Sequence, residues 1–511
     1  MRTWVAVLLL TAGCASAPIR RADLPRLAEA DTRVLEGCYD CLIEARDTYE
    51  RLATGRARPL IAPRLFEVHV LIALREAELA RDPEASFARA EALLPALSPE
   101  ADGPLHLEIA RAILPDSVGT PRAELRARLE RARPLIARNA DIRASLDAAR
   151  VSPAFRGYLA AGLACLVAEG SSPVRRVAAD IPPDAPPLLK YRLATCPMLR
   201  PEIQEQVLAE VPGFIEAGLQ RARRPQLLFT AAYIRDLRGW LNAAYERFPD
   251  SPSATYAIGA MHQTVSDCRA AIEHYEETLA LAPGHEYASM QRVVCLGYLG
   301  QHQTAIAGAT EIIDRAYEGM AADAYYWRAW NRHQIEQLAE ARSDAQRSID
   351  VEATARAHAL AGFVDYDMKA MDLAEAHLTS ALRIDQSQCL AAWHLGLVQF
   401  ARESWAAMTE AFTGSAACYK READANEVRL ASTRDADLDP DYKAIQVANF
   451  ELVIRDDRGQ EEASYLNAAN GYTRIGQVDR ALAALARIPD HSPHAEGARE
   501  LRAFVATLTS P

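Results

Sequence analysis

The sequence predicts an all-α protein whose helix pairs stack into a solenoid. Three observations support this prediction. Hydrophobic residues make up 50% of the chain, so a large apolar core can form. Alternation of apolar and polar residues, which is typical of a half-buried strand, is scarce throughout. Segments with the same spacing of small and large residues recur at intervals of about 34 residues, which indicates stacked repeats.

The clearest repeat starts at Ser253, in the segment SATYAIGAMHQTVSDCRAAIEHYEETLALAPGHEYA. Gly259 and Ala271 are small residues that let two helices approach closely, and Tyr275 fills the groove between those helices. Pro283 ends the second helix and sets the turn into the next unit. Further units carry Ala305 and Ala309, Ala341 and Ala345, Ala376, Gly396 and, in a separated last unit, Gly476 and Ala481.

These spacings resemble the tetratricopeptide repeat family, whose unit is a helix–turn–helix of about 34 residues. The resemblance covers residues 251–420 as a tandem array and about 460–490 as a final unit. It implies a right-handed superhelix in which the first helices of the units line a concave groove. We therefore expect a scaffold or adaptor that holds segments of other proteins or peptides.

The rest of the mature chain is also predicted to be helical. Residues 31–250 have the pattern of degenerate helix pairs similar to the repeats. The proline-rich stretch 181–187 predicts a loop or a domain joint within them. Residues 421–511 are expected to form a C-terminal helical region with a final repeat-like unit, and two of its helices should be separated at Asp439 and Pro440.

The N-terminus has the pattern of an export signal. Residues 1–13 combine one positive charge with a short apolar run, and LTAGC then resembles a bacterial lipobox that ends at Cys14. Thr11 departs from the aliphatic residue preferred there. The resemblance implies lipidation of Cys14, a tether over residues 14–30 and, because Ala15 follows, an outer-membrane lipoprotein on the periplasmic or surface face. The alternative is an ordinary secretory signal cleaved near CASA.

The remaining cysteines are even in number, which permits disulfides in an exported protein. We predict three long-range pairs, Cys268–Cys295, Cys389–Cys418 and Cys165–Cys196. The first two cysteines lie at similar distances on either side of Pro283, so antiparallel helices would place them opposite each other. The second pair flanks the internal turn of one unit in the same way. The alternative is buried free thiols that act as small hydrophobes.

Cys38 and Cys41 form a C-x-x-C motif with several chemical interpretations. Haem attachment requires a following His, where Leu42 stands, and a zinc site requires a second ligand pair. The surrounding sequence is helical and lacks the strand of a thioredoxin frame. A local disulfide or two packed cysteines remain, with an envelope redox or enzyme-accessory role as the alternative.

Composition and motifs argue against other function classes. The net charge of −12 at pH 7 and the lack of a basic stripe argue against nucleic-acid binding. His491 and His494 stand alone in a C-terminal loop, so we predict no metal. The sequence has no Gly-rich phosphate loop, no G-x-S-x-G and no nucleophile–base pair. We therefore predict a non-enzymatic protein without a cofactor.

The family resemblance places an aromatic-rich set of side chains on the groove. The residues mapped to it are Tyr256, Tyr287, Met290, Tyr298, Tyr326, Trp330, His333, Met368, Trp393 and Phe400. Aromatic rings and Met form an adaptable wall for a bound peptide. Two alternatives remain: several of these residues fill the core between repeats, or the protein is a structural envelope component that assembles through its own repeats. The Lys and Asn positions of a carboxylate clamp are missing.

Overall fold

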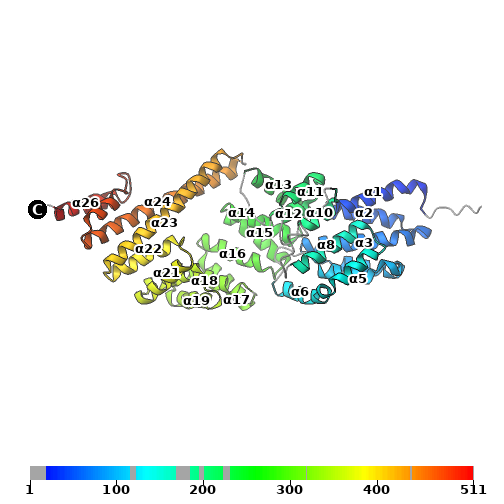
Figure 1. Ribbon diagram of the computed structural model, residues 1–511, viewed down its shortest axis with the longest axis horizontal. Coiled ribbons are helices and arrows are strands. Elements are labelled where there is room, and N and C mark those ends of the chain that lie inside the picture. The colour runs from blue at the N-terminus through cyan, green and yellow to red at the C-terminus, as the bar shows by residue number, and fades with distance from the viewer. Residues whose placement is uncertain are drawn as a thin grey trace, which may run out of the picture. The chain divides into compact units, whose positions relative to one another are not determined.

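The computed structural model describes residues 19–114, 122–168, 184–194, 201–222, 231–317, 319–437 and 440–509. Every regular element within these ranges is a helix, which confirms the predicted all-α fold (Figure 1). The chain forms two compact units. Unit 1 comprises Met1–Ser117 and Ala127–Arg221, and unit 2 comprises Val118–Arg126 and Ala222–Pro511. The predicted lipidation site Cys14 lies outside the described residues, as does Cys196.

Unit 1 is organised around one buried helix. Its α-helices are α1 (Leu24–Glu36), α2 (Tyr39–Leu52), α3 (Arg58–Glu78), α4 (Glu84–Glu91), α5 (Gly103–Ala112), α6 (Arg122–Ala137), α7 (Asn139–Ala148), α8 (Pro153–Ala168), α10 (Pro187–Ala194), α11 (Pro201–Glu210) and α12 (Ile215–Ala222). The start of α6, up to Arg126, and the last residue of α12 are counted with unit 2. Short 3-10 helices span Arg21–Asp23, Gly55–Ala57, Leu94–Ala96 and Pro99–Ala101. Helix α3 is buried along nearly its whole length, and α2, α4 and α5 contact it. Helix α10 returns to contact α1, so unit 1 closes on itself.

Unit 2 is an array of antiparallel helix pairs. Helix α13 (Ala231–Arg247) precedes it and contacts α14. The pairs are α14 (Pro252–Thr264) with α15 (Cys268–Leu281), α16 (Glu286–Tyr298) with α17 (His302–Asp314), α18 (Ala321–Gln334) with α19 (Leu338–Val351), α20 (Ala355–Asp367) with α21 (Met371–Ile384), and α22 (Cys389–Ala401) with α23 (Trp405–Asp435). The chain ends with α24 (Pro440–Arg474), α25 (Val478–Leu485) and α26 (Ala495–Thr509).

Local chemistry sets the limits of these helices. The Ser251 hydroxyl accepts a hydrogen bond from the backbone N–H of Ala254, and Pro252 starts α14. The Asp267 carboxylate caps α15 in the same way. Such caps satisfy backbone donors that have no partner within the helix. The sequence therefore encodes the start of these helices through residues that lie next to them.

Close approach of paired helices depends on small residues at their contact. At Gly396 in α22, a Cβ atom would lie 2.7 Å from two ring atoms of Phe412 in α23. Ala341 and Ala345 of α19 are fully buried against α18 and α20. Unlike unit 1, unit 2 therefore builds a series of small cores, each between neighbouring helices.

Helices α23 and α24 differ from the preceding pairs in length. They span 31 and 35 residues and lie side by side as an antiparallel hairpin (Figure 1). The sequence predicts a separation at Asp439 and Pro440, and α24 begins at Pro440. The C-terminal part of α24 pairs with α25, which gives the final helix pair expected near 460–490.

Candidate protein-binding face

The first helices of the five pairs share one face of unit 2. Successive first helices, from α14 through α16, α18 and α20 to α22, contact one another, and they do so more closely than successive second helices. In a curved array, the more closely packed row lies on the inner side of the curve. We call this inner surface the first-helix face.

Most of the sequence-predicted groove residues lie on these five helices. Tyr256 is on α14, Tyr287, Met290 and Tyr298 are on α16, Tyr326, Trp330 and His333 are on α18, Trp393 and Phe400 are on α22, and Met368 directly follows α20. The placement agrees with the register that the family resemblance implies. Exposure then separates side chains that a partner can reach from side chains that fill the core.

Several of the predicted residues fill the core. Met290 is only 4% exposed and packs with Val293 and Leu296, so the expectation that it contacts a ligand is corrected. Trp393 packs edge to face on Phe412, with ring centroids 5.1 Å apart. Met368 packs against the core formed by α18, α19 and α20. These three side chains face neighbouring helices because the gap between repeats requires large apolar groups.

Aromatic side chains connect α16 and α18 on the first-helix face. The Tyr298 ring is 5.5 Å from Trp327 and 6.2 Å from Trp330, centroid to centroid. Trp327 in turn lies 5.6 Å from Trp330 and 5.4 Å from Tyr326. All four contacts are edge to face, an arrangement that the ring quadrupoles favour. Tyr298 nevertheless remains 64% exposed, so the cluster presents an aromatic surface to solvent.

Similar contacts occur where other first helices meet. Tyr256 of α14 stacks on His285 at the start of α16, with centroids 4.9 Å apart. Phe363 of α20 lies 4.3 Å from His394 of α22. At the end of α22, Phe400 is 47% exposed and contacts Trp405 at 6.0 Å. We call this set the aromatic ladder: Tyr256, Tyr298, Tyr326, Trp327, Trp330, Phe363, Tyr366 and Phe400.

The charged groups next to the ladder pair with each other. Arg356 of α20 forms an ion pair with Asp323 of α18, and its guanidinium lies 4.8 Å from the centre of the Tyr326 ring. His333 Nε2 lies 2.6 Å from the Asp367 carboxylate. Both contacts join α18 to α20, and the Arg356–Asp323 pair neutralises two opposite charges on the face.

Burial shifts the pKa values of three ladder tyrosines and of the neighbouring His394. It raises the pKa of Tyr256 to about 12, and it also raises the pKa values of Tyr298 and Tyr326. It lowers the pKa of His394. Phenols and this imidazole are therefore neutral near pH 7.

The groove residues predicted from the sequence do not include Trp327, Phe363, Tyr366 and His394. The repeat register contained a signal for two of them. Phe363 and Tyr366 stand at the same register positions in α20 as Trp330 and His333 in α18. Trp327 and His394 lie off those register positions, and only the packing of adjacent helices brings them to the ladder.

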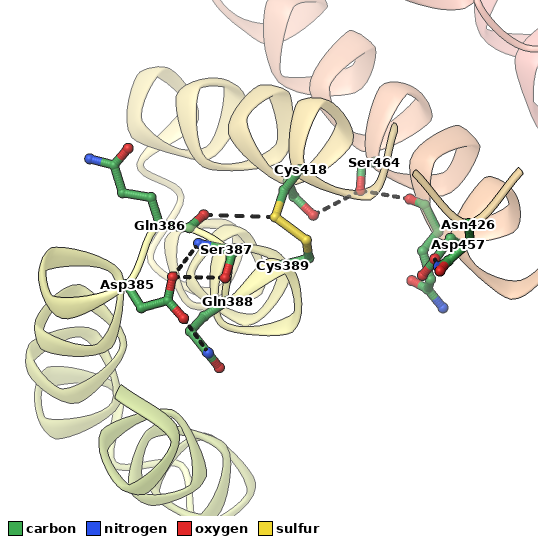
Figure 2. Close-up of a disulfide and its surroundings, with 11 residues drawn as sticks. Asp385, Gln386, Ser387, Gln388, Cys389, Cys418, Asn426, Asp457 and Ser464 are labelled. Atoms are coloured by element: carbon green, nitrogen blue, oxygen red, sulfur yellow. Dashed lines mark hydrogen bonds between the residues drawn. A yellow bond between two sulfur atoms is a disulfide. The ribbon is translucent and has the colours of Figure 1, made fainter. Parts of the chain in front are cut away.

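The structure forms two of the sequence-predicted disulfides among the described residues. Cys389 at the start of α22 is bonded to Cys418 in α23, with Cα atoms 5.3 Å apart (Figure 2). Cys38 and Cys41 are bonded at the start of α2, with Cα atoms 5.0 Å apart. Cys165 is also disulfide-bonded, while the partner expected for it, Cys196, lies outside the described residues.

The expected Cys268–Cys295 disulfide is not formed. Both residues are buried free cysteines, packed with Tyr275 between α15 and α16. Burial raises the pKa of each thiol, and the two thiols interact with each other. A raised pKa disfavours the thiolate that oxidation requires. Cys268 and Cys295 are therefore buried free thiols, as the alternative prediction had it, and the expected disulfide between them is wrong.

Unit 1 contains a separate cavity of about 350 Å³. Asp31 forms its polar side, accepting hydrogen bonds from Arg64 and from the Tyr49 hydroxyl. Glu67 also lines the cavity and accepts a hydrogen bond from the backbone N–H of Ser152 at 2.8 Å. These polar groups satisfy each other, so the cavity offers no distinct chemistry.

The described parts of the chain contain neither a candidate metal cluster of three or more side chains nor a helix that could span a membrane. Their His, Cys, Asp and Glu side chains form no group of three or more that could hold a metal ion. None of their helices has both the length and the apolar character needed to cross a bilayer.

Comparisons with known proteins give structural likeness only. No protein-family model and no curated protein matches the sequence. A crystal structure of MamA is 20% identical and covers 33% of this chain and 97% of its own, with a TM-score of 0.29. YrrB, described as a TPR protein with an unusual peptide-binding site, is 14% identical over 52% of this chain and 97% of its own, with a TM-score of 0.25.

The APC/C hetero-tetramer Cut9-Hcn1 contains a chain that matches a larger part of the protein. It is 12% identical and covers 94% of this chain and 95% of its own, with a TM-score of 0.39. With TM-scores this low, the fold assignment depends on this chain's own repeat register and paired helices. These features make unit 2 an all-α solenoid of antiparallel helix pairs, with a register that resembles tetratricopeptide repeats.

Proposed function

We propose that unit 2 is a scaffold that binds an extended segment of a partner protein on its first-helix face. The aromatic ladder is the observation that carries this proposal. Tyr298, Tyr326, Trp327 and Trp330 of the ladder pack on one another. Tyr298 nevertheless remains 64% exposed, and Phe400 is 47% exposed. Large aromatic groups supply contact area at low entropic cost, and exposed apolar patches of this kind are typical of interaction sites. Stacked repeats extend such a surface over several helices.

We further infer that a lipid on Cys14 anchors the protein in the bacterial outer membrane, on the periplasmic or surface face. The LTAGC motif and the following Ala15 support this proposal. The Cys38–Cys41 and Cys389–Cys418 disulfides agree with it, because structural disulfides persist in oxidising compartments. Cys14→Ser should abolish labelling by radioactive palmitate and release the protein from membrane fractions. Retention of the label would contradict the assignment.

A redox function through Cys38 and Cys41 has less support. Thiol–disulfide exchange needs access to a sulfur atom, but Cys38 and Cys41 are only 2% and 5% exposed. The Cys38 sulfur also accepts a hydrogen bond from the Cys41 backbone N–H. A staple at the start of α2 accounts for both observations.

Crosslinking tests the scaffold function directly. A photo-reactive phenylalanine analogue replaces Tyr298, because this exposed side chain can change without loss of core packing. Irradiation of envelope fractions should give defined adducts, and Tyr326→Ala/Trp330→Ala in the same chain should remove them. Tyr245→Ala, on α13, is the matched aromatic control and should leave them unchanged.

Two outcomes of the crosslinking experiment would argue against the proposed scaffold function. Adducts that persist in the double variant would show that the ladder does not hold the partner. A second copy of this chain as the main adduct would favour the self-assembling alternative over a scaffold for other proteins.

A further inference from the structure

Two histidines face each other within the fourth helix pair of the array. His358 lies on α20 and His377 on α21, and these two helices pack against each other. The Nδ1 atoms of the two rings are 3.2 Å apart, and the ring centroids are 5.5 Å apart. One ring can donate its Nδ1–H to the other. If both rings instead carry their proton on Nε2, both Nδ1 lone pairs point at the same place and can hold one cation.

The distance between the two nitrogens suits a shared metal ion. Zinc binds imidazole nitrogen at about 2.0–2.1 Å and prefers tetrahedral geometry. A metal ion at that distance from two nitrogens 3.2 Å apart makes a nitrogen–metal–nitrogen angle of about 100°. The tetrahedral angle is about 109°. A metal ion can therefore bind between His358 and His377 with little movement of α20 or α21.

The Asp365 carboxylate lies next to the other ring nitrogen of His377. Its Oδ2 atom is 3.8 Å from His377 Nε2, and its side chain is only 2% exposed. Arg342 holds the other carboxylate oxygen, with Nε 2.9 Å from Oδ1. Metal-binding histidines commonly direct their second ring N–H toward a carboxylate, which fixes the tautomer. Asp365 therefore favours the form of His377 whose Nδ1 is free to bind a metal ion.

The charges around the pair oppose each other. Arg383 lies close enough to His358 to lower the pKa of its imidazole, after the larger effect of burial, and it would also repel a cation. Asp365 attracts a cation on the side of His377. Coordination by imidazole therefore decides which ion binds. Imidazole suits zinc, copper and nickel, whereas magnesium and calcium prefer oxygen ligands.

We propose that His358 and His377 bind one divalent transition-metal ion, of the zinc, copper or nickel class, between α20 and α21. The chain supplies two ligands, and water completes the coordination because both side chains are partly exposed. The bound ion ties the first helix of this repeat to the second. The site uses no residue of the aromatic ladder.

Isothermal titration calorimetry with ZnCl₂ tests this proposal on the full chain, purified without a polyhistidine tag and freed of metal by a chelator. His358→Gln/His377→Gln should weaken zinc binding at least tenfold. The matched control is His262→Gln/His274→Gln, a pair on α14 and α15 whose rings stack at 5.5 Å, with 19° between their planes. Stacked rings direct their in-plane lone pairs away from a common point, so this variant should bind zinc as the parent does.

Electron paramagnetic resonance with Cu²⁺ identifies the ligands directly. The parent should show hyperfine splitting from two imidazole nitrogens, and His377→Gln should show the splitting of one. Asp365→Asn tests the positioning role: it should weaken zinc binding about tenfold and yet keep the two-nitrogen signal. Unfolding midpoints measured in chelator show whether each variant is folded before metal is added.

Three results would overturn the metal site. Zinc binding by His358→Gln/His377→Gln that equals the parent's would show that the pair is only hydrogen-bonded. An unchanged Cu²⁺ signal in His377→Gln would show the same. Equal binding of MgCl₂ and ZnCl₂ would exclude imidazole coordination. None of these results affects the crosslinking test of the scaffold function, so the two proposals stand or fall separately.

Discussion

Gly396 shows how one missing side chain sets the contact between two helices. The Cβ of Gly396→Ala would lie 2.7 Å from the Phe412 ring, which is only 1% exposed and cannot move away freely. We expect a loss of roughly 1–3 kcal/mol, the usual cost of overpacking a core. Gly414→Ala is the control: no heavy atom would lie within 4 Å of its Cβ, so helix propensity should stabilise it by about 1 kcal/mol. Chemical denaturation measures the free energy of unfolding of both variants. Equal changes in this free energy would contradict the packing argument.

A buried ionic cluster in unit 1 shows a second residue-scale effect. The Arg75 guanidinium contacts both oxygens of Glu78 at 2.7 Å and donates to the Gly37 carbonyl at 3.0 Å. The Tyr191 hydroxyl donates to Glu78, and the Glu216 carboxyl accepts the backbone N–H of Tyr39. Arg75 thereby joins segments that are far apart in the sequence.

Glu216 makes the stability of unit 1 depend on pH. Burial raises the pKa of its carboxyl to about 7, above its usual value, although Arg75 opposes the shift. Between about pH 4.5 and 7 the folded state holds this proton and the unfolded state releases it, so stability falls as pH rises. Below about pH 4.5 the Glu216 carboxyl is protonated in both states, so its burial costs no free energy of ionisation. Above about pH 7 it is a buried carboxylate in the folded state, and the full loss of stability applies.

Glu216→Gln should remove this dependence. The amide oxygen can still accept the Tyr39 N–H, and no charge is buried at high pH. Unfolding free energies measured from pH 4.5 to 7.5 should fall less steeply in the variant than in the parent. Parallel curves would show that the carboxyl ionises at its ordinary pKa.

At the scale of elements, the two described disulfides differ in the length of chain that they close. Cys389–Cys418 spans 29 residues and ties the start of α22 to α23, whereas Cys38–Cys41 spans 3 residues within one helical turn. The longer loop has more conformational entropy in the unfolded chain, so its bond stabilises more. Figure 2 also shows the Gln386 carbonyl next to Cys418, at 3.8 Å from the sulfur.

Replacing each pair by alanine tests this difference. Cys389→Ala/Cys418→Ala should cost roughly 3–4 kcal/mol by the loop-entropy relation. Cys38→Ala/Cys41→Ala should cost distinctly less, and it serves as the matched control. Denaturant unfolding of the oxidised proteins measures both losses of stability. Equal losses, or a larger loss for Cys38→Ala/Cys41→Ala, would refute the loop-length explanation.

At the scale of the whole molecule, two units with separate cores should unfold separately. Unit 1 has a core gathered around α3, and unit 2 has a series of local cores. We expect two calorimetric transitions. Gly396→Ala should lower the temperature of one, and Glu216→Gln should alter the pH dependence of the other. A single transition that both variants shift would show that the units unfold as one.

Local patterns in the sequence were sufficient to predict the fold of unit 2. Helix spacing and the small residues at helix contacts repeat within about 34 residues, so each unit can be recognised from its own segment. Gly396 is one example, and the same register placed Cys389 opposite Cys418 and Tyr326 and Trp330 on the first-helix face. These features depend on contacts between consecutive helices.

The backbone conformation of the turns inside the repeats could not be predicted from local residue preferences. Gly300 has a φ of 73° in its turn, as the sequence suggests. Ser266, Glu336, Lys369 and Glu403 adopt the same left-handed region in equivalent turns without being glycine. That conformation costs roughly 1–2 kcal/mol for such residues, and packing of the two joined helices compensates. No residue preference could have predicted it.

The sequence by itself determined the all-α class, the repeat register and which residues lie on the first helices. The tertiary structure decided which of those residues are accessible: it buried Met290, kept Cys268 and Cys295 as free thiols, and paired Arg356 with Asp323. The physical reason is the distance along the chain over which the interactions act. Periodicity and capping act over a few residues, whereas burial, pKa and charge pairing depend on side chains that only folding brings together.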